Sequence, residues 1–235
     1  MGTLRHSWDV PVAEARAIQE ALRDRVEERD RFGPVRRVAG ADVSYDRGSP
    51  ILYAAVVVLD ADSLQVVDSA SVCMRAGFPY VPGYLSFREM PALLAAFERL
   101  RTPPDLLLAD GHGRAHPRRC GIACHLGVAL DLPTLGCAKS RLLGEHREPG
   151  ARRGSSTQLL HDGELIGRVV RTRDGVKPVY VSVGHRVSLQ TAQRLVLRLA
   201  PRWRLPEPVR AAHEEVNRLR REARGVTRRV PGARR

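Results

Sequence analysis

Long apolar stretches and abundant cysteines are both missing from this 235-residue chain. No apolar run approaches the roughly 18 residues that a membrane-spanning helix needs, so the class of membrane-spanning proteins is excluded. Residues 1–8 lack the apolar core of a signal peptide, and we therefore expect an intracellular, cytoplasmic protein. The four cysteines are too few for a disulfide-stabilised fold.

Lysine is scarce in a strongly basic sequence. The formal net charge is +13, yet only Lys139 and Lys177 among the 39 basic residues are not arginine. Such an excess of positive charge favours a polyanionic partner, most often nucleic acid. A membrane-surface role is less favoured because no basic amphipathic helix stands out. A lysine retained in an arginine-rich chain indicates a position that requires an ammonium group.

Apolar periodicity and turn residues divide the chain into alternating segments, without internal repeats. Helices are predicted near residues 11–30, 86–100, 117–130, 188–199 and 207–221. Strands are predicted near residues 35–45, 51–59, 65–74, 106–109, 135–138, 165–171 and 178–183, with a polar connection over 143–156. We expect one domain over residues 1–223 and a basic, disordered tail over residues 224–235.

The order of these segments predicts the fold. Three strands joined by short turns form an antiparallel meander, and a helix, a strand, a helix and a further strand follow. This is the layout of the ribonuclease H-like α/β fold, in which parallel strands extend the meander into a mixed central sheet flanked by helices. Its first and fourth strands lie side by side at the centre of the sheet.

Two aspartates fall on those two strands. Leu106 to Ala109 form an uninterrupted apolar run, typical of a strand buried on both faces, and the run ends on Asp110. Asp42 interrupts the apolar pattern of the first strand. If both lie at one edge of the sheet, their repulsion favours a bound cation. The alternatives are that Asp110 caps a turn and that Asp42 faces solvent.

The segment before the 86–100 helix is stiff and aromatic. It reads Pro-Tyr-Val-Pro-Gly-Tyr over residues 79–84, and it holds Tyr80 between two prolines. An aromatic ring held in this way suits insertion into a base stack, although Tyr80 could also be a core aromatic. Glu89 follows Ser86 with the spacing of a helix capping box. The alternative to a functional role for Glu89 is therefore that it caps the N-terminus of this helix.

A zinc site is less favoured. His112, His116, Cys120 and Cys124 follow one another at steps of four, and such clusters can bind zinc. A glycine and a proline interrupt a continuous helix through them, and the cysteines lie on an apolar stripe, where free cysteine is usually buried. The chain also lacks the glycine-rich phosphate-binding loop of P-loop proteins.

Six longer segments carry a resemblance to one family. They are residues 41–45, 79–89, 110–118, 136–140, 181–186 and 206–213. In order and in sequence they resemble the motifs of endonuclease V, the deoxyinosine-specific repair nucleases. The resemblance covers roughly residues 10–220 and leaves out the basic tail; Ala41 and Cys137 are small neutral departures from the pattern.

The resemblance implies a ribonuclease H-like fold in a monomer, and Mg²⁺-dependent hydrolysis, with Mn²⁺ as a substitute. The bond cleaved is the second phosphodiester 3′ to a hypoxanthine nucleotide in DNA. Asp42 and Asp110 resemble the central metal ligands, and Glu89 an outer one. The catalytic residues implied are these three together with Lys139, near the scissile phosphate, and His213. Tyr80 resembles the wedge that replaces the flipped base, and the implied base pocket comprises Gly83, Leu85, Gly111, Gly113 and His116.

Two other functions stay open. A related enzyme could act mainly on inosine in single-stranded RNA, and the sequence does not settle the sugar preference. A non-catalytic nucleic-acid-binding module on the same fold requires that the carboxylates do not gather. Metal-dependent nicking distinguishes such a module from a nuclease.

Overall fold

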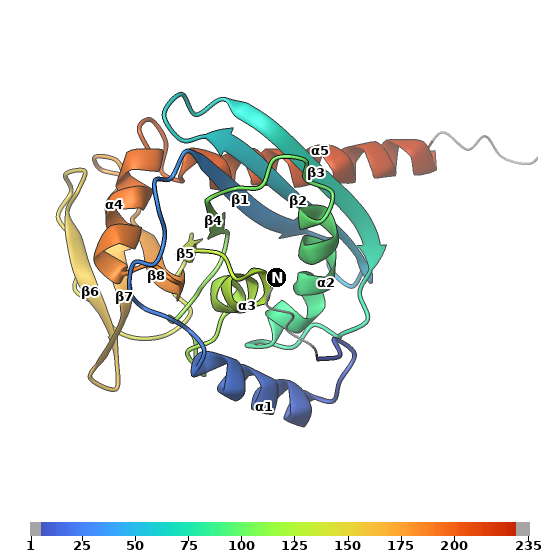
Figure 1. Cartoon of the computed structure of the whole chain (residues 1–235), viewed down its shortest axis with the longest axis horizontal. Helices are drawn as coiled ribbons and strands as arrows, with labels where there is room; N and C mark the ends of the chain where they lie inside the picture. The colour runs from blue at the N-terminus through green and yellow to red at the C-terminus, as the bar shows by residue number, and fades with distance from the viewer. Residues whose placement is uncertain (1–5, 229–235) are drawn as a thin grey trace, which may run out of the picture.

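The computed structural model describes residues 6–228 and contains one mixed eight-stranded sheet flanked by helices (Figure 1). The strands are β1 (Arg37–Ser44), β2 (Ile51–Asp60), β3 (Val66–Arg75), β4 (Leu106–Ala109), β5 (Thr134–Ala138), β6 (Ser156–His161), β7 (Glu164–Val170) and β8 (Val179–His185). The helices are α1 (Val12–Arg23), α2 (Leu85–Phe97), α3 (Ile122–Leu130), α4 (Leu189–Leu199) and α5 (Glu207–Arg228). Among the described residues, no helix has the length and apolar character needed to cross a bilayer.

The sheet has the predicted topology. Its strand order is β3-β2-β1-β4-β5-β8-β7-β6. Strands β1 to β3 form an antiparallel meander, and β1, β4 and β5 run parallel to one another. The predicted contact between the first and fourth strands is confirmed, because Ala41 is paired with Ala109. Asp42 and Asp110 therefore follow paired residues at the carboxyl ends of neighbouring parallel strands.

The two faces of the sheet are covered by different helices (Figure 1). Leu106 and Leu108 of β4 pack with α4 and α5, whereas Leu107 and Ala109 pack with α2 and α3. Alternate residues of a strand point to opposite faces, so a strand covered on both sides is apolar throughout. Continuing the alternation directs Asp110 toward the α5 face, and Asp42 points the same way because Val38 packs there.

The close approach of α5 to the sheet depends on Gly40. A Cβ atom at Gly40 would lie 1.8 Å from the carbonyl oxygen of Pro208, in the first turn of α5. No side chain fits this gap, so α5 crosses β1 directly over the glycine. The same contact brings the following turn of α5 over the carboxyl end of β1.

Gly40→Ala is therefore expected to lower the free energy of unfolding by about 1–3 kcal/mol, because the helix backbone must shift to admit the methyl group. Denaturant unfolding of the variant measures this loss. Gly33→Ala is the matched control, because a Cβ there meets no atom within 4 Å. Equal stabilities for the two variants would contradict the packing described.

The predicted end of the first helix and the predicted start of the third helix are wrong. The first helix ends at Arg23 rather than near residue 30, because the backbone of Glu27 hydrogen-bonds to Arg186 and the side chain of His185 instead. The helix predicted from residue 117 begins only at Ile122. Residues 110–121 form a compact turn in which a Cβ on Gly121 would lie 2.3 Å from the His112 carbonyl oxygen.

Strand β6 was not predicted. It pairs with β7 at the edge of the sheet, and in its burial pattern only Leu159 is buried, so it carries little apolar signal. At the other end of the chain, α5 continues to Arg228, beyond the predicted end near residue 221. The helix therefore includes the first residues of the predicted tail, and Arg224 forms an ion pair with Asp46. Residues 229–235 lie outside the described part of the chain.

Candidate active site

Three side chains from distant parts of the chain meet at the centre of the sheet. Asp42 lies near the carboxyl end of β1, Asp110 directly follows β4, and His213 lies on α5. Each offers one ligand atom, and these atoms lie within 4.8 Å of one another. The Nδ1 of His213 donates a hydrogen bond of 2.8 Å to Asp42 Oδ2. The backbone N–H of Val43 donates to Asp42 Oδ1 at 2.8 Å. The alternative of a solvent-facing Asp42 is wrong, since the residue is only 9% exposed.

Lys139 completes this cluster. It follows β5, and its Nζ lies 2.5 Å from Asp110 Oδ2. Burial and the neighbouring carboxylate of Asp42 raise the pKa of Asp110, whereas Lys139 and His213 oppose the rise. Lys139 and His213 together therefore do not fully offset the effects of burial and of the Asp42 charge on Asp110. Two carboxylates held this close together, with an imidazole beside them, fit a divalent metal ion.

Glu89 lies beside the cluster but outside the group of three ligand atoms. It is on the first turns of α2, where no side chain caps the helix end, so the capping-box alternative is wrong. Burial, followed by repulsion from Asp42, raises the pKa of Glu89 to about 8. Glu89 thus lies close enough to Asp42 and Asp110 for their charges to act on its carboxyl group.

The aromatic loop before α2 leaves Tyr80 at the surface. Its side chain is 58% exposed, so the alternative of a core aromatic is wrong. The ring approaches Tyr45 edge-to-face, with 6.5 Å between centroids. Beside it lies an open groove of about 800 Å³, which is lined by Tyr45, Arg47, Gly48, Ser49, Pro50, Tyr80 and Arg88. Tyr80 is therefore free to contact another molecule.

The glycine turn after β4 packs closely against the sheet. The N–H of Gly113 donates to Ser182 Oγ at 2.8 Å, and a Cβ on Gly113 would lie 1.9 Å from the Val183 carbonyl oxygen. A Cβ on Gly111 would meet the side chain of Ile122 at 2.8 Å. Both glycines are thus needed to bring the turn against β8 and α3.

His116 connects this turn to the aromatic loop. Its Nε2 lies 3.0 Å from the carbonyl oxygen of Gly83, and its Nδ1 accepts from the N–H of Arg118 at 3.3 Å. Burial, followed by the charge of Arg118, lowers the pKa of His116 to about 4, so the imidazole is neutral near pH 7. This contact places the glycine turn, which holds His116, against the aromatic loop, which holds Gly83 and leads into α2 at Leu85.

The two cysteines of the discounted zinc pattern are buried with apolar neighbours. Cys120 and Cys124 pack with Leu22 of α1 and Val128 of α3. Burial raises the pKa of both thiols, which disfavours the thiolate that zinc binds. Their placement on an apolar stripe is confirmed.

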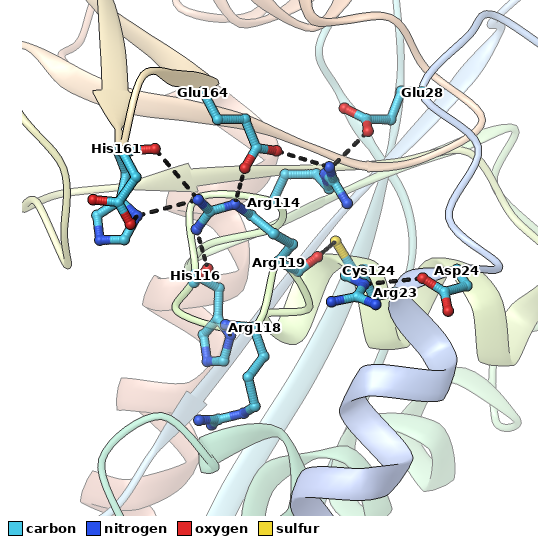
Figure 2. Close-up of polar contacts among 11 residues, drawn as sticks. Arg23, Asp24, Glu28, Arg114, His116, Arg118, Arg119, Cys124, His161 and Glu164 are labelled. Carbon is cyan, nitrogen blue, oxygen red and sulfur yellow. Dashed lines mark hydrogen bonds and ion pairs between the residues drawn. The ribbon is translucent and has the colours of Figure 1, made fainter.

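Sequence reasoning missed several contacts around these residues. Figure 2 shows Arg119 reaching from the turn toward the β6–β7 hairpin, where it bonds Glu164 and His161. Arg119 also donates to the carbonyl of His116 at 3.1 Å. No sequence signal indicates this network, because its members are far apart in the chain. Asn217, by contrast, donates to His213 Nε2 at 3.1 Å from one helical turn away, a spacing visible in the sequence.

A mixed sheet that gathers carboxylates, an imidazole and a lysine at the ends of its central parallel strands defines a nuclease of the ribonuclease H-like class. Residues 20–214 match the family model for endonuclease V. The chain belongs to the endonuclease V family. An endonuclease V from Roseiflexus castenholzii is 58% identical over 207 residues, which is 88% of this chain and 92% of the relative.

Solved structures agree in fold. The crystal structure of the endonuclease V from Streptomyces avermitilis aligns with a TM-score of 0.88 at 48% identity, covering 92% of this chain and 96% of that one. A Ciona intestinalis endonuclease V aligns with a TM-score of 0.79 at 29% identity, covering 90% and 98%. That protein was crystallised with a 24-mer DNA containing an inosine followed by a ribo-adenosine.

Proposed function

We propose that this nuclease recognises deoxyinosine in DNA and hydrolyses the second phosphodiester bond on its 3′ side. The observation that carries the proposal is the convergence of Asp42, Asp110 and His213 beside Lys139. The net charge of +13 supports a nucleic-acid substrate. All of these groups come from one chain, which supports action as a monomer, and a cytoplasmic location is proposed with it.

We further propose that Mg²⁺ is the natural metal and that Mn²⁺ can replace it. Asp42 and Asp110 would hold the ion, with Glu89 and His213 as outer members of the site. Hard oxygen donors favour Mg²⁺ over metals that prefer sulfur. When bound, a divalent cation lowers the pKa of a coordinated water and neutralises charge on the scissile phosphate.

The protein side chains have separate tasks in this proposal. Lys139 supplies a positive charge to the scissile phosphate, a task for which a compact ammonium suffices. His213 keeps Asp42 in one orientation through its 2.8 Å hydrogen bond. Gly83, Leu85, Gly111, Gly113 and His116 form the base pocket, where closely approaching backbone groups can hydrogen-bond to hypoxanthine. Hypoxanthine pairs weakly, so extruding it from a duplex costs less than extruding a matched base.

The proposed function is tested with an end-labelled duplex that contains one inosine, with and without Mg²⁺. The nick is expected at the second phosphodiester bond on the 3′ side of the inosine. It is expected only when the metal is present. Matched duplexes, and RNA of the same sequence, are assayed in parallel. Preferred cleavage of the RNA would favour the alternative of an inosine-specific ribonuclease, and binding without any nicking would favour a non-catalytic module.

Tyr80→Ala is expected to reduce the preference for inosine over matched duplexes about tenfold, because stacking between an aromatic ring and a base is lost. The ratio of the two nicking rates measures the preference. Tyr80→Phe is the matched control, since it keeps the ring and removes only the hydroxyl. An unchanged ratio in the alanine variant would refute the wedge role.

A further inference from the structure

Three hydrogen-bond donors converge on the carbonyl oxygen of Gly83, between Tyr80 and α2. They are Gln19 Nε2 at 3.2 Å, His116 Nε2 at 3.0 Å and the Nη2 of Arg118. Gly83 has a φ of +80°, a conformation that favours glycine. Its carbonyl therefore links the aromatic loop to the glycine turn and to α1.

The buried amide of Gln19 holds two of these segments at once. The residue is 1% exposed, and its Oε1 accepts from Arg118 Nε at 2.6 Å. Arginine can only donate, so this bond fixes the amide orientation and directs Nε2 toward Gly83. Accepting from Arg118 while donating to Gly83 requires a side chain with both an acceptor and a donor, which an apolar residue lacks.

Helix α1 is packed against the rest of the protein by apolar side chains, without the amide of Gln19. Leu22 and Ile18 pack with the buried Cys120 and Cys124, and Ala15 packs with Phe78 and Phe87. A buried amide costs free energy unless it is hydrogen-bonded, so an apolar residue would serve attachment equally well. The polar side chain at position 19 is therefore explained by the groups that it bonds, which are Arg118, Gly83 and, at 3.4 Å, the Oγ of Ser86 in the first turn of α2.

Besides its bond to Gln19, Arg118 has a second contact, with an aromatic ring. Its guanidinium lies over the ring of Tyr84, 4.0 Å from the centroid. Figure 2 shows Arg118 and His116 on one side of the turn, whereas Arg119 extends to the other side, toward His161 and Glu164. The turn is thus fixed to the β6–β7 hairpin by Arg119, and its contact with the aromatic loop runs through Arg118, His116 and Gln19.

We propose that Gln19 is a positioning residue for inosine recognition, which holds the Gly83 and His116 walls of the base pocket at a fixed separation. This inference rests on the proposed function, since it assumes that these two residues contact the base. Gln19 lies just before the residues that match the family model. Its effect on the substrate passes through Gly83 and Arg118, and it takes no part in the chemical step.

The test compares Gln19→Met, Gln19→Glu and wild type by steady-state kinetics on inosine and adenosine duplexes, and by thermal unfolding. Gln19→Met removes all three bonds, whereas Gln19→Glu keeps the acceptor for Arg118 and loses the donor to Gly83 and Ser86. Gln193→Met is the matched control, since that amide bonds Ser156 between α4 and β6. Both Gln19 variants are expected to raise KM for inosine about tenfold with little change in kcat, as loss of a buried hydrogen bond to the pocket implies.

The two Gln19 variants are also expected to lower the preference for inosine over adenosine by a similar factor, and the control is expected to retain both values. A wild-type preference in the Gln19 variants would overturn the inference, and so would a lowered melting temperature with an unchanged preference. If Gln19→Met does not fold, Gln19→Glu decides, because its ion pair with Arg118 preserves the packing. A wild-type enzyme without any preference would instead refute the proposed function.

Discussion

Asp110→Asn is expected to reduce nicking of an inosine duplex by at least about a thousandfold, which corresponds to several kcal/mol of lost transition-state stabilisation. The amide keeps the shape of the side chain but removes a negative charge from the cluster with Asp42 and His213. Binding of the duplex is expected to persist, because the basic residues that give the chain its net charge of +13 are unchanged. Initial nicking rates and a gel-shift assay measure the two properties.

The same variant is expected to unfold at an equal or higher temperature. Burial and the charge of Asp42 raise the pKa of Asp110 in the folded protein, so its ionised form destabilises the fold at neutral pH. Removing that charge relieves the repulsion. Asp162→Asn is the matched control, since Asp162 lies in the β6–β7 turn with a φ of +56°, which asparagine tolerates. If Asp110→Asn nicks the duplex as fast as the Asp162→Asn control, the carboxylate cluster is not required for catalysis.

Lys139→Met is expected to slow nicking about a hundredfold, because a charge on the developing phosphate transition state is lost. The duplex should still bind, and kcat should fall more than the affinity. Lys139→Arg is expected to recover part of the rate only, since the larger guanidinium does not fit the short contact with Asp110. Single-turnover nicking at saturating enzyme separates the chemical step from binding.

The other lysine of the chain provides a matched control for this prediction. Lys177 is exposed, and the contact described for it uses its backbone carbonyl, which accepts from Arg204. Lys177→Met removes the same charge from the protein as Lys139→Met does. Equal rates for the two variants would show that net charge, and not the position of Lys139, determines the rate.

The central part of the fold could be predicted because strand order constrains it. A meander followed by a helical connection brings β1 beside β4. The uninterrupted apolar run of β4 indicates a strand that is covered on both faces. From there, alternation along each strand directs Asp42 and Asp110 to one face. The scarcity of lysine drew attention to Lys139 and Lys177 alike, and only the resemblance indicated that Lys139 and His213 belong to the site. Nothing in their local sequence shows where β5 and α5 meet the cluster.

The remaining errors come from interactions between distant residues. Residues 24–30 continue a helical pattern, yet their backbone bonds to Arg186 and His185, which no local pattern reveals. Ser86 and Glu89 have capping-box spacing, but α2 begins one residue earlier and Glu89 is directed to the acidic cluster. Gln19 looks like one polar residue of an amphipathic helix until Arg118 and Gly83 are placed beside it.

Direct measurement of metal binding tests the central claim, that aspartates from two strands share one divalent ion. Titration of the protein with Mn²⁺, followed by electron paramagnetic resonance of the free ion, gives the number of sites and their affinity. The wild type is expected to bind Mn²⁺ with Mg²⁺ as a competitor, and Asp42→Asn and Asp110→Asn are each expected to lose the same site. Unchanged Mn²⁺ binding in both variants would contradict the account.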